Sequence, residues 1–154
     1  MRVSAVQNHF SLLHRSSELA GILDYCKENN ITFYAYMVLE QGALSGKYDA
    51  RHPFPEGSDR AKCYGSVLPK LEKLIEKLRQ LGGKYNASPA QIATAWAIAK
   101  GTLPIIGVTK TEQVQDTAKA AEIVLSAEEI LDLETLGDMS NINTLRELEK
   151  KMEG

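Results

Sequence analysis

The sequence predicts an α/β domain with a parallel sheet, and three observations lead to this fold class. Short apolar segments, which are typical of strands, alternate with longer segments whose apolar residues recur at helical spacing. One of the short segments, residues 31–37 (ITFYAYM), is apolar on both faces, as parallel strands buried under helices are. The resulting order is strand, helix, strand, two helices, strand and helices, which indicates successive βα units.

The first part of the chain is expected to hold two strands, one helix and one long loop. Residues 3–7 (VSAVQ) are short, apolar and β-branched, as a buried strand is. A helix capped by residues 16–18 follows and ends near Asn30, since Asn accommodates the left-handed conformation at a helix end. The apolar residues of that helix are Leu19, Ile22, Leu23 and Cys26. After the strand at 31–37, residues 40–66 form a Gly- and Pro-rich loop, and loops of this length are usually functional or disordered.

The next part is expected to hold two helices and the third strand. Residues 68–81 carry apolar side chains at helical spacing and end at Gly82-Gly83. Residues 88–91 (SPAQ) are a strong helix start, with Ser as the cap, Pro in the first turn and Gln three residues on. That helix should end at Gly101, with a buried stripe of Ile92, Ala95, Trp96 and Ala99. Residues 103–108 (LPIIGV) predict the third strand.

Two further capping boxes predict helices near the end of the chain. Residues 109–112 (TKTE) open one that reaches about Ala120, and residues 126–129 (SAEE) open another. The second is expected to face inward through Ile130, Leu133 and Leu136. Residues 143–154 are expected to form a charged, amphipathic helix. No internal repeat or low-complexity tract divides the chain, so one domain over residues 1–154 is expected.

Composition excludes several classes of function. The net charge of −2 and the pI of about 5.9 leave no basic field for nucleic acid. No apolar run approaches the roughly 20 residues that cross a membrane, and residues 1–10 lack the charged and apolar regions of a signal peptide. The two cysteines, Cys26 and Cys63, make neither a disulfide framework nor a CxxC pair. A reducing cytoplasm fits these observations.

Residues 107–113 (GVTKTEQ) predict an anion site where a strand leads directly into a capped helix. The N-terminus of such a helix offers backbone N–H groups and the positive end of the helix dipole, which suits a phosphate. Lys110 would add a full charge there. The alternative, which the spacing alone favours, is an ordinary strand–turn–helix connection in which Lys110 is solvated.

Residues 34–48 predict a second candidate site, at the end of a buried strand. Tyr36 is placed to stack on a planar ligand ring. Gly42 and Gly46 allow a ligand to approach the backbone, and Lys47 can reach an anion. The alternative is a core tyrosine followed by a flexible loop. Neither glycine pattern matches the Rossmann or P-loop fingerprint.

Four motifs in series resemble the aldo-keto reductases in order and spacing. They are residues 6–13 (VQNHFSLL), 35–39 with 42–48 (AYMVL, GALSGKY), 88–93 with Trp96 (SPAQIA), and 104–108 (PIIGV). The resemblance extends from Val3 to about Gly137 and implies an NADP(H)-binding TIM barrel, a (β/α)8 fold. A complete TIM barrel needs roughly 250 residues. The 154 residues are therefore expected to form a partial barrel of about three parallel strands with flanking helices, without strands one to five.

The resemblance also implies a cofactor site. Gln7 would hold the nicotinamide carboxamide, and Tyr36 would stack on the nicotinamide ring. Met37, Leu39, Gly46 and Lys47 would line the pyrophosphate. The adenosine 2′-phosphate would lie against Gly107, Val108, Thr109 and Lys110, and the adenine against Gln113, Asp116 and Thr117. The chain departs from the family at Met37, where Ser is frequent, and at Asp116-Thr117, where Glu-Asn is frequent.

The family's catalytic Asp, Tyr, Lys and His belong to earlier strands, and no segment here matches them. No catalytic or metal-binding residue is therefore predicted. A capping or surface role is favoured for His9, His14 and His52, with a substrate-pocket role for His9 as the alternative.

The resulting hypothesis is a chain derived from an NADPH-dependent carbonyl reductase that is inactive by itself, binds NADP(H) weakly, and meets a carbonyl substrate only in a complete barrel. Two alternatives stay open: a non-catalytic binding or assembly module, and an incomplete gene product without a function of its own. Self-association through the open sheet edges is expected in either case.

Overall fold

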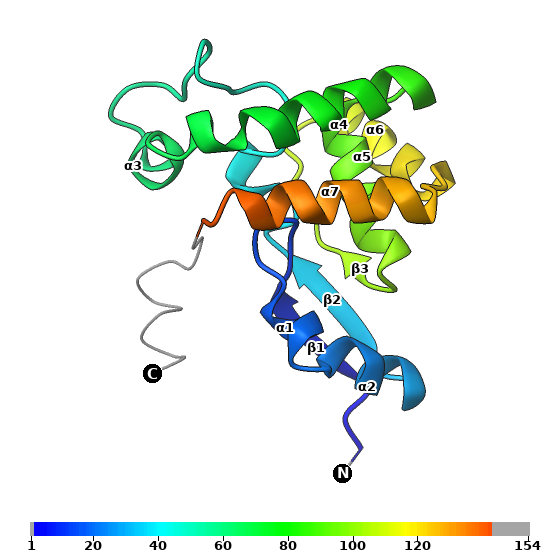
Figure 1. Ribbon diagram of the computed structural model, residues 1–154. Coiled ribbons are helices and arrows are strands. Elements are labelled where there is room, and N and C mark those ends of the chain that lie inside the picture. The colour runs from blue at the N-terminus through cyan, green and yellow to red at the C-terminus, as the bar shows by residue number, and fades with distance from the viewer. Residues whose placement is uncertain (1, 143–154) are drawn as a thin grey trace.

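The computed structural model describes residues 2–142, which fold into a three-stranded parallel sheet with flanking helices (Figure 1). The strands are β1 (Ala5–His9), β2 (Thr32–Tyr36) and β3 (Leu103–Pro104), in the spatial order β1-β2-β3. Parallel pairing aligns Gln7 with Tyr34, and Tyr34 with Leu103. The predicted α/β class and strand number are confirmed. The predicted helix at residues 143–154 lies outside the described residues.

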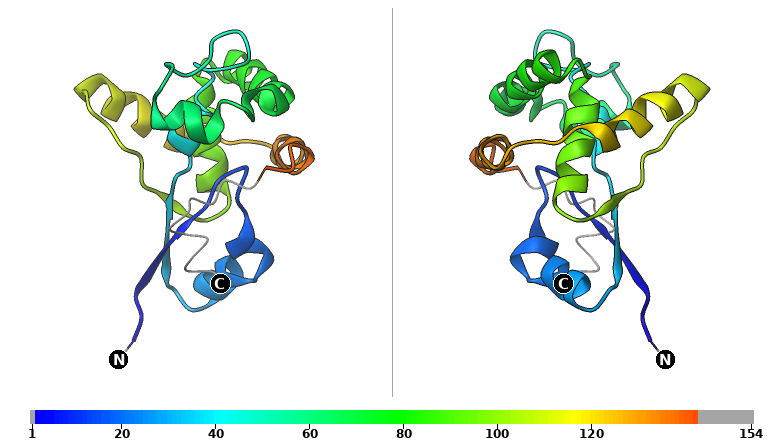
Figure 2. Two further views of the ribbon diagram at one scale, coloured as in Figure 1. Left: turned by 90° about the vertical axis from the view of Figure 1, so that its left-hand side faces the viewer. Right: turned by 90° about the vertical axis from the view of Figure 1, so that its right-hand side faces the viewer.

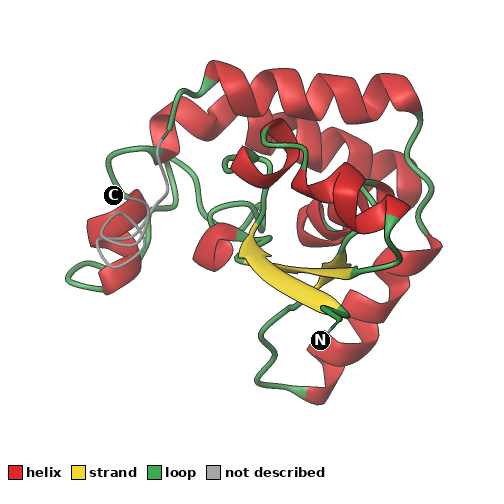
Figure 3. Ribbon diagram, turned by 90° about the horizontal axis from the view of Figure 1, so that it is seen from below, coloured by secondary structure: helices red, strands yellow, loops and turns green. Residues whose placement is uncertain are grey.

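Among residues 2–142, helices cover only one face of the sheet, which corrects the expectation that residues 31–37 would be buried on both. Burial alternates along β2, where Phe33 and Ala35 are buried while Thr32 is exposed. The opposite side, here called the bare face, contains Gln7, Tyr34, Tyr36, Leu103 and Ile105, all of which are exposed or half-buried. Seen from below, the strands lie open beside the helices (Figure 3).

The third strand is shorter than residues 103–108 because its neighbour ends early. β2 stops at Tyr36, since the next residue, Met37, has left-handed backbone with φ 61°. The amide of Ile105 still donates to the Ala35 carbonyl at 2.8 Å, but residues 106–108 have no strand beside them. They continue as extended chain toward α6 (Thr111–Lys119), which projects from the rest of the molecule (Figure 2). The first strand begins two residues later than predicted.

The helix predicted over residues 16–30 is two helices, α1 (Ser16–Leu19) and α2 (Ile22–Glu28). They are separated at Gly21, whose φ of 75° is outside the helical range. The break leaves Leu19 83% exposed, although its spacing predicted a core position. Cys26 of α2 is buried as expected, and Cys63 is exposed.

The predicted loop over residues 40–66 contains two helical segments. A 3-10 turn, η1 (Glu40–Gly42), follows β2, and α3 (Asp59–Tyr64) lies near the end of the loop. The Ser58 hydroxyl caps α3 by accepting from the Ala61 amide at 3.1 Å. The loop is therefore ordered over much of its length.

The helix expected to end at Gly82-Gly83 begins and ends later. A 3-10 turn, η2 (Leu68–Leu71), precedes α4 (Glu72–Tyr85), which runs through both glycines to a left-handed Asn86 with φ 51°. Gly82 is required for a different reason. A Cβ at this position would lie 2.6 Å from the Ala87 carbonyl oxygen, so the glycine permits the close turn into the next helix.

The capping boxes at Ser88 and Ser126 are confirmed. Ser88 caps α5 (Pro89–Ala99), and Ser126 caps α7 (Ala127–Met139). Each serine hydroxyl accepts from the backbone amide three residues on, and each serine amide donates to the side chain of that residue, Gln91 or Glu129. At α6 the predicted partner is wrong. The Gln113 side chain, and not Glu112, accepts from the Thr109 and Lys110 amides. A 3-10 turn, η3 (Ala120–Glu122), continues α6.

The core lies between the sheet, α4, α5 and α7. The Trp96 ring stacks on Phe10 with centroids 5.1 Å apart, and Phe10 meets Phe33 edge-on. Ile92 and Ala95 are buried as predicted, but Ala99 is exposed. On α7, Leu133 is fully buried and Ile130 and Leu136 pack against the core. No helix within residues 2–142 is long and apolar enough to cross a membrane.

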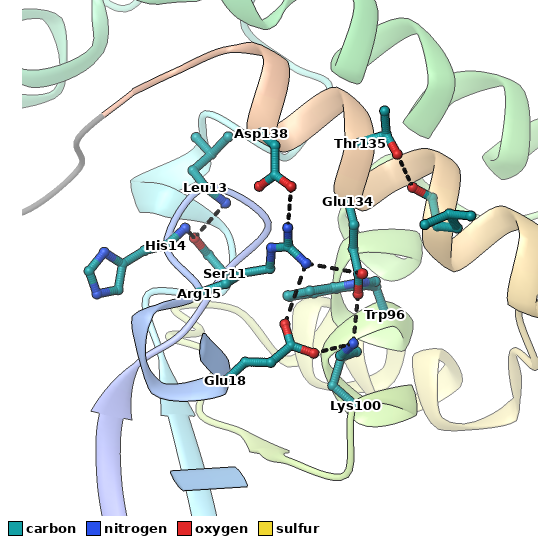
Figure 4. Close-up of polar contacts among 11 residues, drawn as sticks. Ser11, Leu13, His14, Arg15, Glu18, Trp96, Lys100, Glu134, Thr135 and Asp138 are labelled. Atoms are coloured by element: carbon teal, nitrogen blue, oxygen red, sulfur yellow. Dashed lines mark hydrogen bonds and ion pairs between the residues drawn. The ribbon is translucent and has the colours of Figure 1, made fainter. Parts of the chain in front are cut away.

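A charged network fastens α7 to the start of α1 and the end of α5 (Figure 4). Arg15 reaches Glu134 at 3.0 Å and also contacts Asp138 and Glu18. Lys100 contacts Glu134 at 2.8 Å, as well as Glu18. The Trp96 indole N–H donates to Glu134, so the network rests directly on the core.

Glu129 fastens the other end of α7 to α4. Its carboxylate accepts from Lys84 Nζ and the Tyr85 hydroxyl, each at 2.6 Å, and from the Ser126 amide at 2.8 Å. Burial alone would raise the pKa of this carboxyl, but the hydrogen bonds outweigh burial and lower the pKa from 4.5 to about 2. The ionised form therefore stabilises the folded chain.

We expect the stability difference between the native chain and Glu129→Gln to shrink on acidification. A carboxyl whose folded pKa is lowered stabilises above its unfolded pKa, and that stabilisation is lost as the pH falls from about 4.5 toward 2. Urea unfolding at pH 6 and pH 3 measures the difference. Glu128→Gln, at the exposed neighbour, is the matched control. An equal difference at both pH values would contradict the assignment.

Candidate cofactor-binding site

Two adjoining hollows lie beyond the C-terminal ends of β2 and β3. One is a cavity of about 230 Å³ between α5, residues 106–108 and α6. The other, of about 400 Å³, lies between residues 37–42, α3 and residues 105–107. Both are lined by Leu39, Ile106, Gly107 and Gln113, so they form one continuous site. Among the described residues, no group of three or more His, Cys, Asp or Glu is placed to hold a metal ion.

The structure brings more than half of the predicted cofactor residues together around these hollows. Segments far apart in the sequence contribute them: the end of β2, the extended chain after β3, and one side of α6. The lining residues that the sequence predicted are Met37, Leu39, Gly107, Val108, Gln113, Asp116 and Thr117.

The other predicted residues lie around the hollows without lining either of them. Gln7 and Tyr36 are on the bare face of the sheet, where the Tyr36 ring lies 5.6 Å from the His9 ring. Gly46 and exposed Lys47 belong to the loop after η1, and Thr109 and Lys110 are exposed at the start of α6.

Several lining residues were not predicted as site residues. Arg60 of α3 lines the larger hollow and adds a cation to its wall. Ser88 and Gln91 line the smaller cavity together with Ser45 and Thr94. The sequence identified Ser88 and Gln91 as a helix cap, which they are, but the cap also faces the cavity. For Arg60 no local signal exists, because the preceding loop has to fold before α3 reaches the hollow.

The turn that carries Met37 and Leu39 has an unusual backbone. Met37, Glu40 and Gln41 have φ of 61°, 46° and 53°, in the left-handed region that side chains disfavour. Conformations of this kind cost on the order of 1 kcal/mol each and persist only where the surroundings enforce them. Short backbone hydrogen bonds close the turn, from Glu40 N to Met37 O and from Gly42 N to Leu39 O, both at 2.8 Å.

The loop after this turn is fixed against α4 and α5. Arg79 donates to the Gly46 carbonyl and to the Asp49 carboxylate, each at 2.7 Å. The bond from Arg79 to Asp49, with others from His52 and Arg51, holds the pKa of Asp49 well below its usual range. Gly46 has φ 74°, and a Cβ there would lie 2.5 Å from Pro89 Cγ, so only glycine fits between the loop and α5.

The helix N-terminus predicted as a phosphate site is partly occupied by the chain itself. Gln113 Oε1 accepts from the Thr109 amide at 2.7 Å and the Lys110 amide at 3.0 Å. The amides of Thr109 and Lys110 are therefore already bonded within the chain. Gly107 has open space where a side chain would stand, so a ligand can approach its backbone.

The histidines lie in two kinds of environment. His52 is exposed and contacts Asp49 at 3.1 Å, which agrees with a surface role. His14 contacts the Ser16 hydroxyl near the protein surface and stacks on His9. His9 contradicts the favoured surface role, because it is only 4% exposed and bonds to the buried carboxylate of Glu40 at 2.7 Å.

Comparison with known proteins identifies the family to which the chain belongs. The aldo/keto reductase family matches residues 1–138, and the chain therefore belongs to that family. A putative aryl-alcohol dehydrogenase of Schizosaccharomyces pombe is 33% identical over 84% of this chain and 37% of its own length. The chloroplastic pyridoxal reductase of Arabidopsis thaliana is 35% identical over 84% of this chain and 35% of its own length.

A solved structure supports the fold assignment. The glycerol dehydrogenase of Gluconobacter oxydans matches 93% of this chain and 45% of its own with a TM-score of 0.75, at 23% identity. Its likeness concerns the fold alone. The open three-stranded sheet with flanking helices is accordingly a partial TIM barrel, as the resemblance implied. The chain spans about two fifths of the length of the curated relatives it matches.

Proposed function

We propose that this chain is the part of an NADP-dependent aldo-keto reductase that binds the cofactor. The observation that carries the proposal is the convergence of three separate segments on one site at the C-terminal ends of the strands. An aldo-keto reductase of Schizosaccharomyces pombe whose name specifies NADP(+) is 31% identical over 91% of this chain and 43% of its own length. Such a name supports NADP(H) as the cofactor.

The residues around the hollows fit an extended dinucleotide. Gln7 and Tyr36 would hold the nicotinamide end at the bare face. Met37, Leu39 and Gly46 with Lys47 would follow the pyrophosphate, and Arg60 adds a cation at the larger hollow. Gly107, Val108, Thr109 and Lys110 would take the 2′-phosphate, and Gln113, Asp116 and Thr117 the adenine. When bound, NADPH supplies a hydride for the reduction of a carbonyl group.

We expect NADPH to bind more tightly than NADH, with Lys110 responsible for the preference. The Lys110 side chain is exposed at the start of α6, where a 2′-phosphate would gain one charge-assisted hydrogen bond. Loss of such a bond, about 1.5 kcal/mol, should reduce the preference roughly tenfold in Lys110→Ala. Calorimetry with both cofactors measures it, with Lys119→Ala at the other end of α6 as the control. Equal affinities of the native chain for both cofactors would count against the site.

A second proposal concerns assembly, and the bare face favours it. Leu103 and Ile105 are 51% and 43% exposed beside half-buried Tyr34 and Tyr36. Both outer strands also leave one row of backbone N–H and C=O groups without a neighbouring strand. We propose that the chain associates with itself over these surfaces, as either a reductase segment or a non-catalytic assembly module would. Cytoplasmic localisation stays a prediction.

A further inference from the structure

Glu40 has a fully buried carboxylate that the cofactor site itself does not use. It is 0% exposed and lines neither hollow. Three side chains from two segments hold it. His9 Nε2 lies 2.7 Å from Oε1, the Ser11 hydroxyl donates to the same oxygen, and the Tyr64 hydroxyl donates to Oε2 at 2.7 Å. Removing a carboxyl group from water is unfavourable unless the group is paired. The three hydrogen-bonding partners therefore indicate that the side chain of Glu40 has to be held at this position.

The backbone of Glu40 shapes the wall of the site. Glu40 belongs to the left-handed turn that begins at Met37, and its carboxylate points inward to the core. The residues on either side, Leu39 and Gln41, line the hollows, although half-buried Leu39 also packs against the core. The buried hydrogen bonds therefore hold the unfavourable turn in place and present its two neighbours to the ligand.

The same carboxylate connects the turn with two other parts of the site. Tyr64 is the last residue of α3, and Arg60, one helical turn earlier, lines the larger hollow. His9 ends β1 and contacts the ring of Tyr36, the residue proposed to stack on the nicotinamide. The buried carboxylate of Glu40 thus fixes the positions of the turn, Arg60 and Tyr36 relative to one another.

We propose that Glu40 is a positioning residue for the cofactor site, acting through His9, Ser11 and Tyr64. This inference rests on the proposed function, because it assigns Glu40 a task in binding the nicotinamide dinucleotide. It concerns the shape of the site and not a direct contact, since Glu40 does not reach the hollows.

Variants of Glu40 and its partner test the proposal by cofactor affinity. NADPH binding to the whole chain is followed by fluorescence, at a temperature where near-ultraviolet circular dichroism shows each variant to be folded. We expect Glu40→Gln to weaken binding about tenfold, the effect of losing one hydrogen-bonded charge, and Tyr64→Phe to weaken it less. Glu56→Gln, at an exposed glutamate of the same loop, should leave affinity unchanged. A lower melting temperature with unchanged affinity would mean a merely stabilising role and would overturn the proposal.

Hydrogen exchange without cofactor separates this proposal from the proposed function. In Glu40→Gln, or in Tyr64→Phe if the first variant does not fold, the amides of Glu40, Gly42 and residues 59–64 should exchange about tenfold faster, while those of α5 keep their native rates. If the native chain binds no NADPH, the proposed function fails, and exchange alone then decides whether Glu40 fixes the turn. Unchanged exchange at these amides would refute it.

Discussion

The 154-residue chain by itself is expected to oxidise NADPH with an aromatic aldehyde at least about 10⁴-fold more slowly than an ordinary enzyme. General acid catalysis contributes roughly 10²–10⁴-fold, and each preorganised donor to a developing oxyanion roughly 10²–10³-fold. The resemblance assigns these tasks to an Asp, a Tyr, a Lys and a His that no segment of this sequence matches. A bound hydride donor without them leaves the carbonyl oxygen unprotonated.

The described residues contain one cluster that combines tyrosine, histidine and a carboxylate, and its geometry argues against acid catalysis. Tyr64, His9 and Glu40 are 2%, 4% and 0% exposed, and none of them lines the hollows. A substrate carbonyl therefore has no route to the Tyr64 hydroxyl, which already donates to Glu40.

Absorbance at 340 nm with purified chain, NADPH and an aromatic aldehyde measures this activity. Val108→Trp is the control, because it places a bulky ring at a partly exposed wall of the smaller cavity. Turnover that persists in this variant comes from a contaminating reductase. Turnover of about 1 per second or more that Val108→Trp abolishes would show that the chain catalyses alone.

Local signals in the sequence predicted the helix starts well and the interruptions poorly. The capping boxes at Ser88 and Ser126 involve residues only three apart, so they can be read without knowledge of the fold. The length of β3 depends on where β2 ends, and β2 ends because Met37 adopts a left-handed backbone. Gly82 was interpreted as a helix end, but glycine is required there because the Ala87 carbonyl leaves no room for a side chain. Contacts of this kind exist only once the chain has folded.

Some residues of the candidate site could likewise be predicted from the sequence, and others could not. Leu39 was predicted by the family resemblance alone, and Gly107 by the resemblance and by its position where a strand leads into a capped helix. Arg60 reaches the site through a helix inside a segment that the sequence predicted as loop. Glu40 was not identified, because a glutamate beside a loop is normally solvated. Its burial depends on His9 and Tyr64, which lie 31 and 24 residues away.

We expect the chain to self-associate through its open sheet. The bare face presents Leu103 and Ile105 on one side of β3, since residues two apart in extended chain point the same way. Val108 and Val114, near the start of α6 and within it, are also 41% and 52% exposed. Closing the sheet edges with a second copy would restore backbone hydrogen bonds and bury these side chains, which makes a symmetric dimer the expected form.

Light scattering after size exclusion, at micromolar concentration, should give at least twice the monomer mass of 17.0 kDa. Leu103→Lys combined with Ile105→Lys should shift the chain toward the monomer, because charged side chains at an open sheet would have to lose water in the dimer. Leu131→Lys, at a 63% exposed position on α7, is the matched control and should leave the mass unchanged. A native chain that is monomeric and unfolds cooperatively would contradict self-association. That result would point to another segment of the same chain covering the open edges, because monomeric proteins rarely leave a large apolar face exposed.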